Sequence, residues 1–357
     1  MTQPTTSIWA AEPHTIAKHA ILTRYLQAWL PILGASHKRM VYLDAFAGPG
    51  EYSTGELGSP VIAVQTALKH TAKLKAELWF VFYEPDERRC QYLQEVIARM
   101  EVPKHIKPRV RCGTFALAAD RFFKWVQSSN ERTPPTFAFI DPFGYSQIPM
   151  DLIARFAKLK RSEVLINFMY EEINRFLSKP DQKKHFDGLF GCREWRDVPD
   201  LKDPRERNEL LHDLYMRQLR CYAGFRFVRS FEMINAGNHT DYYLFYGSNS
   251  AKGMEVMKNA MWWQDPERGC QFSDLDQSGQ RKLFSEAPTP EDIARELHAS
   301  LTGRTLSIED LELFIADCHF RWAGIKKDVL PLLERKKLLN VERTGRGYVN
   351  GTILHFS

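Results

Sequence analysis

The sequence lacks long apolar runs. None of its 357 residues belongs to an uninterrupted apolar stretch near the roughly 20 residues that a membrane-spanning helix needs, so no such span is expected. Residues 1–4 are not a basic region followed by an apolar run, so no secretory leader is expected either. These two absences predict a cytoplasmic protein with no membrane association.

Closely spaced cysteines are also missing. The six cysteines lie far apart in the sequence and no C-x-x-C pair occurs, which argues against a zinc site and against a dense disulfide framework. We therefore expect reduced thiols and no metal. The cysteines are Cys90, Cys112, Cys192, Cys221, Cys270 and Cys318.

A strong excess of one charge is absent as well. Lys and Arg number 49 and Asp and Glu 44, which gives a formal net charge of +5. Such a charge is compatible with a polyanionic partner but does not identify one. With 44% hydrophobic and 26% charged residues, the composition suits a globular chain with one large and one smaller domain, or two medium ones.

Seven short apolar runs, rich in β-branched and aromatic residues, alternate with helical patterns. The first five are nearly all apolar, as central parallel strands covered on both faces should be, and the last two follow each other after a long interval. This order predicts an α/β fold with the seven-stranded Rossmann-like sheet of class I methyltransferases. The runs are residues 40–46, 78–84, 109–115, 136–141, 164–169, 225–233 and 241–247.

Helical patterns fill the gaps between these runs. Residues 15–30 place apolar side chains on one face of a helix that would cover the sheet before its first strand. A second helix is expected over residues 61–69, with Ser59 as its cap and Pro60 in its first position. A polar stretch over about residues 175–210 is interpreted as an insertion with helical parts, which could form a lid on the substrate side.

A smaller C-terminal domain is predicted for residues 286–357, after a first domain that covers residues 1–285. Three helical patterns, over residues 291–301, 307–318 and 323–337, precede a glycine-tipped hairpin. This order is typical of a winged-helix domain.

Charge is distributed unevenly within that domain. Residues 290–320 are mainly acidic and residues 321–346 mainly basic, and the basic part coincides with the expected third helix and wing. Winged helices contact nucleic-acid phosphates there, although an ordinary solvated face or a protein-binding surface remains the alternative. The candidate nucleic-acid-binding residues are Lys326, Lys327, Lys336, Lys337, Arg343 and Arg346.

A glycine turn follows the first expected strand. Residues 44–50 read Asp-Ala-Phe-Ala-Gly-Pro-Gly, and Gly48 and Gly50 allow the backbone to approach a ligand closely because glycine has no Cβ. The second strand ends in Glu84, whose carboxylate could accept both hydroxyls of a ribose. An acid after each of two neighbouring strands makes a nucleoside-containing cofactor a far more specific prediction than the glycines alone.

The spacing of this loop argues for one cofactor over another. Gly50 and Glu84 are 34 residues apart, compared with roughly 20 in a dinucleotide fingerprint, because residues 51–58 separate the turn from its helix. A pyrophosphate on the N-terminus of that helix is therefore disfavoured, and with it a nicotinamide enzyme. We interpret the loop as a cradle for S-adenosyl-L-methionine, with Asp44 orienting the ammonium group; the alternative is a turn whose acids only cap.

Three more residues are assigned to the cofactor. Phe46 belongs to the glycine loop, and Thr114 and Phe115 close the third expected strand, where methyltransferases usually bind adenine. Phe115 could stack on the base, or it could belong to the core.

A second motif follows the fourth expected strand. Asp141-Pro142-Phe143-Gly144-Tyr145 resembles the [D/N]-P-P-[Y/F] motif of enzymes that methylate amines. The Asp141 carboxylate and the Pro142 carbonyl would align the amine with the methyl group, and Phe143 or Tyr145 would stack on a base that is flipped out of a duplex. The match is imperfect, since Phe143 replaces the second proline and Gly144 stands where the aromatic would fall. The alternative is a strand-ending turn.

These motifs together resemble the three-Cys-motif partner protein (TcmP) family. The similarity rests on Lys18-His19, residues 44–52, Tyr83-Glu84-Pro85 and residues 141–144, and it covers about residues 15–260. The resemblance implies a methyltransferase-like fold and a separate partner protein, encoded nearby, that carries a three-cysteine motif.

The Lys-His helix and the glycine loop also resemble the bacterial ribosomal-RNA adenine-N6 methyltransferases. Carried over by motif, Lys18 would pair with the carboxylate of the cofactor and Asp141 with the substrate amine. Without the family, Lys18 and His19 would lie in a solvent-exposed first turn of a helix.

Two functions follow from these patterns. The first is methyl transfer from S-adenosyl-L-methionine to a nitrogen of DNA or RNA, with an adenine amine as one candidate. The second is a non-catalytic protein that keeps the fold and binds nucleic acid or its partner protein. A nuclease is disfavoured because no clustered D/E-x-K set occurs outside the cofactor motifs.

Overall fold

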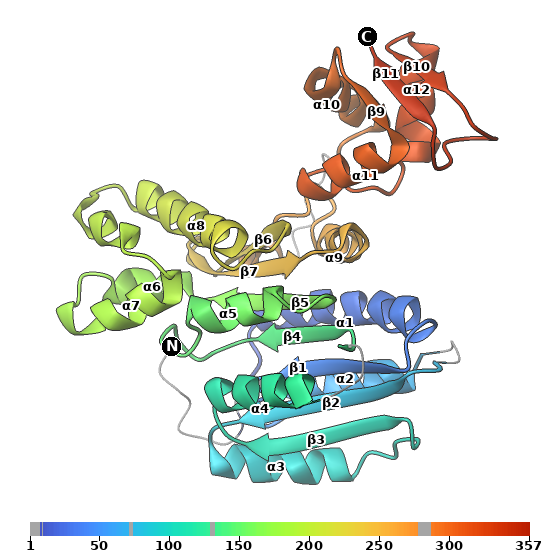
Figure 1. Ribbon diagram of the computed structural model, residues 1–357. Helices are drawn as coiled ribbons and strands as arrows, with labels where there is room; N and C mark the ends of the chain where they lie inside the picture. Colours follow the sequence, from blue (N-terminus) through green and yellow to red (C-terminus); the bar gives the residue numbers. More distant parts are fainter. Residues whose placement is uncertain (1–7, 9, 71–73, 129–132, 278–286) are drawn as a thin grey trace. The chain divides into compact units, whose positions relative to one another are not determined.

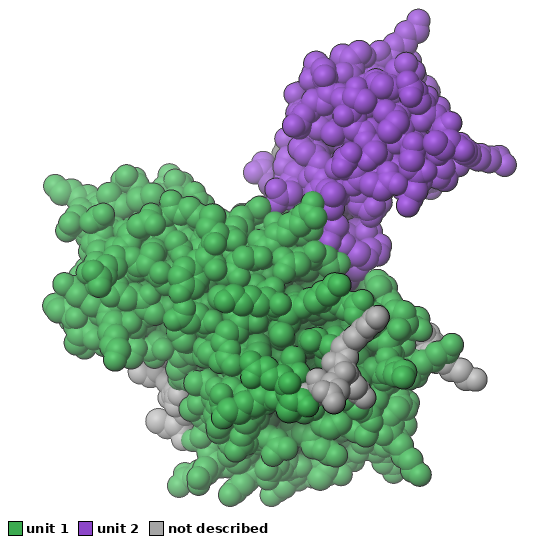
Figure 2. All heavy atoms as spheres, in the orientation of Figure 1, with its two compact units in different colours: residues 1–250, 271–279 green, residues 251–270, 280–357 purple. Residues whose placement is uncertain are grey.

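The computed structural model describes residues 8, 10–70, 74–128, 133–277 and 287–357. The chain forms two compact units, which consist of residues 1–250 with 271–279 and of residues 251–270 with 280–357 (Figure 2). Residues 251–270 thus precede the expected boundary at residue 286 but pack with the C-terminal residues.

The first unit is built on an eight-stranded sheet in the order β3-β2-β1-β4-β5-β7-β6-β8 (Figure 1). The first five strands are parallel, and β7 runs antiparallel to both of its neighbours. This is the order of a class I methyltransferase sheet, so the expected α/β fold is confirmed. The strands are β1 (Arg39–Asp44), β2 (Glu77–Glu84), β3 (Ile106–Cys112), β4 (Thr136–Ile140), β5 (Ser162–Phe168), β6 (Phe227–Ile234), β7 (Thr240–Ser248) and β8 (Gln271–Ser273).

The strand count of seven is corrected to eight. The additional strand is β8, three residues long, which pairs in parallel with the edge strand β6. A segment this short carries no alternation of apolar and polar residues, and the sequence therefore gave no signal for it.

Helices cover both faces of the sheet (Figure 1). The helix α1 buries Ile21, Leu22, Tyr25, Leu26, Trp29 and Leu30 on its sheet-facing side, as its spacing predicts. One apolar cluster joins α4, α5, α7 and α8 to the opposite face of β1, β4 and β5. The helices of the first unit are α1 (Pro13–Gly34), α2 (Ser59–Leu68), α3 (Glu87–Ala98), α4 (Phe115–Ser128), α5 (Met150–Ala157), α6 (Tyr170–Phe176), α7 (Lys183–Phe190) and α8 (Pro204–Cys221), with 3₁₀ turns η1 (Pro180–Gln182), η2 (Glu194–Asp200) and η3 (Asp274–Gln277).

Two local expectations are wrong. The N-cap of α2 is Gly58 rather than Ser59, because the Ser59 hydroxyl donates to the Asp44 carboxylate instead of capping its own helix. The third strand ends at Cys112 rather than at Phe115, which is the first residue of α4. The insertion over residues 175–210 is helical, as expected, and contains η1, α7 and η2.

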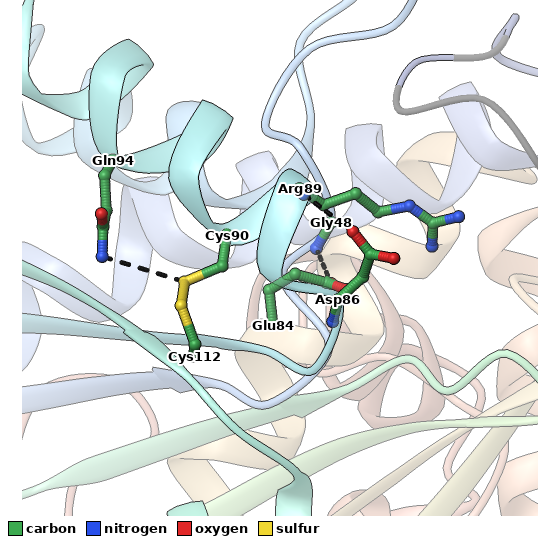
Figure 3. Close-up of a disulfide and its surroundings, with 7 residues drawn as sticks. All are labelled: Gly48, Glu84, Asp86, Arg89, Cys90, Gln94 and Cys112. Carbon is green, nitrogen blue, oxygen red and sulfur yellow. Dashed lines mark hydrogen bonds between the residues drawn. A yellow bond between two sulfur atoms is a disulfide. The ribbon is translucent and has the colours of Figure 1, made fainter.

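The sequence expectation of separate thiols is also corrected. A disulfide joins Cys90 in α3 to Cys112 at the end of β3, with 5.6 Å between their Cα atoms (Figure 3). The residues are 22 positions apart in sequence, but α3 packs on the β2–β3 pair and brings them together. The other four cysteines, all of them described residues, form no disulfide.

In its described residues, the second unit holds four α-helices, α9 to α12, a π-helix and a three-stranded antiparallel sheet in the order β10-β11-β9. The three expected helices and the hairpin follow one another along the chain in the predicted order. The short strand β9 lies between the first two helices, and the third helix begins as a π-helical turn, η4. Leu297, Leu311, Leu330, Leu333 and Leu354 form the centre of its own core. The elements are α9 (Ala251–Gln264), α10 (Pro290–Leu301), β9 (Thr305–Ser307), α11 (Ile308–Asp317), η4 (Ile325–Val329), α12 (Leu330–Arg335), β10 (Leu339–Glu342) and β11 (Ile353–Phe356).

No helix within the described residues is long and apolar enough to cross a membrane. The described residues also contain no group of three or more His, Cys, Asp or Glu side chains arranged to hold a metal ion.

Candidate functional site

The candidate site lies where the strand order changes direction. Consecutive strands extend the sheet from β1 through β2 to β3, whereas β4 pairs on the other side of β1. In open α/β sheets, ligands bind at the carboxyl ends of the strands at this point. Asp44 ends β1 and Asp141 directly follows β4, so two of the predicted acids meet here.

A cavity of about 420 Å³ opens at this position. Its wall comes from the start of α1, the glycine loop after β1 and the turn after β4, together with the end of β5 and Tyr242 in β7. The cavity thus joins the two sequence motifs in one space. Its lining includes Lys18, His19, Phe46, Gly48, Gly50, Tyr52, Asp141, Pro142, Phe143, Asn167 and Tyr242.

Asp141 is held on both sides of its carboxylate. The Lys18 ammonium donates to Oδ2 at 2.6 Å, and the Asn167 amide Nδ2 donates to Oδ1 at 2.6 Å. Lys18 is only 6% exposed, and its Nζ lies 5.2 Å from the centre of the Tyr242 ring. The two donors fix the direction of the carboxylate, and the Lys18 charge compensates that of Asp141.

This ion pair bears on one of the two sequence interpretations of Lys18. Lys18 and His19 are buried in α1, so the solvent-exposed alternative is wrong. The Lys18 ammonium contacts Asp141, the residue expected to hold the substrate, and since an ammonium has three N–H donors, its contact with a cofactor carboxylate stays a prediction. Burial and the neighbouring Lys18 charge lower the pKa of His19 to about 3, so its imidazole is neutral.

Asn167 is a site residue that the sequence analysis missed. It is 2% exposed in β5 and lines the cavity, and its Oδ1 has no hydrogen-bond partner within the described part of the chain. Since the Asp141 carboxylate can only accept, Asn167 must turn its NH₂ toward Asp141, which leaves the carbonyl oxygen as an acceptor. The available signal was a single amide inside the otherwise apolar run of residues 164–169.

The glycine loop is shaped by a close approach. Gly50 has φ +85°, and a Cβ at this position would lie 2.7 Å from the Leu93 Cδ1 of α3. The loop returns through a bridge between Glu51 and Leu57 before α2 begins. Only glycine allows α3 to pack this tightly under the loop.

Asp44 is completely buried beneath this loop. Its carboxylate accepts from the Ser59 hydroxyl at 2.6 Å and from the Phe46 backbone N–H at 3.2 Å. Burial raises the pKa of Asp44 from 3.8 to about 7, although both hydrogen bonds oppose the rise. Asp44 does not line the cavity itself but lies directly behind residues that do.

Glu84 ties three loops together. Its Oε2 accepts from the Gly48 N–H at 2.9 Å and its Oε1 from the Asp86 N–H at 3.0 Å (Figure 3). Its backbone carbonyl accepts from Gly113 N–H at 3.0 Å. Burial raises the pKa of the Glu84 carboxyl. Each carboxylate oxygen has a second lone pair, so the group can still accept from a ligand.

The two residues predicted for adenine lie elsewhere. Phe115 is 1% exposed and packs against Phe46 and Phe156, with ring centroids 5.9 and 6.3 Å apart. It belongs to the core, which was the alternative from sequence. Thr114 is exposed, and its hydroxyl accepts from the Leu117 N–H in the first turn of α4. Neither residue lines the cavity.

The aromatic residues after Asp141 separate. Phe143 lines the cavity, with the Arg89 guanidinium 5.7 Å from its ring centre. Tyr145 points away from it, because its ring stacks on Phe186 at 4.6 Å and its hydroxyl donates to Gln182. Gly144 has φ +104°, which explains why no aromatic residue stands at that position.

A histidine with three acidic neighbours forms the outer end of the cavity. His14 is 4% exposed, and its ring contacts Glu12 at 2.9 Å, Asp274 at 3.1 Å and Asp241 at 3.4 Å. Burial lowers the pKa of His14, but the hydrogen bonds to Glu12 and Asp274 outweigh it and the net pKa is raised.

In the second unit, the candidate nucleic-acid-binding residues are mostly exposed. The charge of Arg343 is compensated by an acid, since its guanidinium donates to both carboxylate oxygens of Glu334. Lys326 lies 5.3 Å from the ring centre of Trp322. The exposed residues are Lys327, Lys336, Lys337, Arg343 and Arg346.

Comparison with known proteins finds solved structures of low similarity. The chain is similar to Trm1 from Pyrococcus horikoshii in complex with S-adenosyl-L-methionine, with a TM-score of 0.39 and 11% identity over 72% of this chain and 61% of that one. It is also similar to a DUF519 protein from Legionella pneumophila, with a TM-score of 0.40 and 14% identity over 72% and 94% of the two chains. A DUF574 protein from Streptomyces avermitilis gives a TM-score of 0.35 and 10% identity over 66% and 84%.

This chain therefore spans about three fifths of the length of Trm1. No protein-family profile and no curated sequence matches it. The fold assignment rests on the strand order of the sheet, which is that of the class I methyltransferase fold.

Proposed function

We propose that the protein is an S-adenosyl-L-methionine-dependent methyltransferase. One observation carries this proposal: the glycine loop after β1 and Asp141-Pro142 after β4 line the same cavity. Methyl transfer from the cofactor to an amine is direct, so the cofactor loop and the amine-binding turn must face the same cavity.

The residues fit this cofactor chemically. Asp44, Glu84 and Asp141 end three neighbouring strands, and burial raises the pKa of the first two. Buried carboxylates of this kind are stabilised by a cation or by hydroxyl donors. When bound, S-adenosyl-L-methionine would supply an electrophilic methyl group, with its ammonium near Asp44 and its ribose hydroxyls near Glu84.

The acceptor in this proposal is a nitrogen of a nucleic acid, such as an adenine amine. Asp141, already oriented by Lys18 and Asn167, would accept one N–H of that amine, and the Pro142 carbonyl the other. Phe143 would stack on the base, since Tyr145 is committed to Phe186. Bound S-adenosyl-L-methionine would supply the methyl group, and Asp141 and the Pro142 carbonyl would orient the nitrogen that receives it.

The C-terminal residues extend the proposal. We assign residues 286–357 to a winged-helix domain that holds the nucleic acid through Lys327, Lys336 and Lys337, and residues 1–285 to the methyltransferase domain. A three-Cys-motif protein would be the partner, and the cytoplasm the site of action.

The test is transfer of a radiolabelled methyl group to purified RNA and DNA. Asp141→Ala should abolish transfer while binding of S-adenosylhomocysteine persists, because Asp141 contacts the acceptor and not the nucleoside. Asp200→Ala, an exposed acid, is the matched control and should leave transfer unchanged. Equal transfer by wild type and Asp141→Ala would refute the assigned role.

A second candidate function is a non-catalytic protein that binds nucleic acid or its partner. The specific observation in its favour is that both oxygens of Asp141 already accept hydrogen bonds from the chain itself. This candidate predicts binding of S-adenosylhomocysteine or nucleic acid, with no labelled product from any substrate.

A further inference from the structure

The disulfide lies directly beside the residues assigned to the ribose of the cofactor (Figure 3). Cys112 pairs with Glu84 in the β2–β3 register, and the next residue, Gly113, donates to the Glu84 carbonyl. On the other side, the Cys90 N–H donates to the carbonyl of Asp86, whose own N–H donates to Glu84. Each half of the disulfide is thus two hydrogen bonds or fewer from Glu84.

The same helix also supports the glycine loop. Asp86 caps α3 by accepting from the Arg89 N–H, and Leu93, one turn after Cys90, packs against Gly50. A displacement of α3 relative to β3 would therefore move both Glu84 and Gly50. The disulfide is the only covalent link between α3 and β3 apart from the chain itself.

The two cysteines differ in exposure. Cys90 is 0% exposed, whereas Cys112 is an exposed residue at the sheet edge. A thiolate from outside therefore attacks on the Cys112 side, and Cys90 is then the leaving thiolate. Exposed disulfides are more readily reduced than buried structural ones.

We propose that Cys90–Cys112 is a thiol–disulfide modification site that sets the rigidity of the Glu84 loop and, through it, the affinity for the cofactor. A dithiol reductant attacks the Cys112 sulfur, the bond between the two protein sulfurs breaks, and Cys90 leaves as a thiolate that takes up a proton. The second thiol of the reductant then attacks the mixed disulfide, which releases Cys112. Two electrons pass to the protein, and the reductant becomes a disulfide.

Reduction leaves Glu84 in place but removes the constraint between its two neighbours. More of the loop then has to be ordered when ligand binds, and this weakens binding. The cofactor part of the inference rests on the proposed function, whereas the change in loop rigidity does not.

The first experiment measures hydrogen exchange of the backbone amides of Gly48, Asp86 and Gly113, with and without dithiothreitol. Exchange should be faster in the reduced protein, because all three amides donate to Glu84. Cys112→Ser should show the faster exchange in both conditions. Cys221→Ser, which removes an exposed free thiol, is the control and should respond like wild type.

The second experiment measures the Kd of S-adenosylhomocysteine in the same samples. Reduction should weaken binding by about tenfold, the effect of about one additional residue to be ordered. Equal exchange rates in the two states, or free Cys90 and Cys112 thiols in protein kept under oxidising conditions, would overturn the proposal. If the oxidised and reduced proteins exchange at different rates but bind S-adenosylhomocysteine with equal affinity, the part of the proposal that concerns the cofactor is overturned. Failure of both states to bind S-adenosylhomocysteine would instead refute the proposed function, while a difference in exchange would still support the cross-link.

Discussion

Replacing Asp44 with asparagine should stabilise the protein at neutral and alkaline pH. Asp44 is 0% exposed, and burial raises its pKa from 3.8 to about 7. Asparagine keeps the size of the side chain and the oxygen that accepts from Phe46 N–H, but it carries no charge, and its NH₂ donates to the Ser59 hydroxyl oxygen where Asp44 accepts from Ser59. It therefore resembles the protonated acid at every pH.

The magnitude follows from the two pKa values. In the unfolded chain the Asp44 carboxyl loses its proton near pH 3.8, whereas in the folded protein it keeps the proton until about pH 7. The folded state binds more protons in this interval, so stability falls as pH rises through it. Each pH unit corresponds to about 1.4 kcal/mol, which gives a loss of about 4 kcal/mol that is complete above pH 7.

The assay is urea unfolding of wild type and Asp44→Asn at several pH values. The variant should be more stable by about 4 kcal/mol at pH 8 and equal to wild type within about 1 kcal/mol at pH 4. Asp213→Asn, whose side chain is 78% exposed, is the control and should show no such divergence. A variant that is less stable than wild type at pH 8, or a difference independent of pH, would refute the reasoning.

Two further predictions concern buried cations. Lys258 is 1% exposed and donates to the carbonyls of Ile315, Cys318 and Phe320. Urea unfolding should therefore show that Lys258→Met destabilises the second unit by about 3 to 5 kcal/mol, because the three carbonyls lose their donor. A loss below about 1 kcal/mol would contradict this prediction. The pKa of His14 is raised above 6.5, so its stabilising contact with Glu12 and Asp274 is complete below pH 6.5 and is lost as pH rises through the folded pKa. The melting temperature of wild type should thus decline across that interval relative to His14→Gln; parallel curves would exclude this role.

The central sheet could be predicted from sequence because burial on both faces leaves a local pattern. The runs that become β1, β2, β4 and β5 are nearly all apolar, as is typical of parallel central strands that are buried on both faces. The composition of strand ends is less constrained. The chain changes from β3 to α4 between Cys112 and Phe115, where an apolar residue fits either the end of a strand or the start of a helix. The predicted end of the third strand at Phe115 was wrong for that reason.

The site could be predicted only in part. Glycines and acids at strand ends are visible in sequence, and the cavity confirms that Gly48, Gly50 and Asp141 come together. The disulfide and Asn167 depend on contacts between elements that are not adjacent in sequence. Cys90 faces Cys112 only because of how α3 packs, and Asn167 reaches Asp141 only because β5 pairs with β4.

The two aspartates of the site differ in how their charge is compensated. Lys18 compensates the charge of Asp141, so the acceptor side is balanced without a ligand. Within the described residues no cation contacts Asp44 in this way, and the cost of its ionisation to folding grows up to about pH 7 and stays at its full value above that pH. A protein under no constraint but stability would place a neutral side chain at this position, as the expected gain from Asp44→Asn indicates. The cost is offset if a positively charged ligand binds beside Asp44, because the ligand then lowers the pKa of the carboxyl and recovers the free energy lost on folding. An ammonium group on the cofactor side, and not on the acceptor side, is what this asymmetry favours.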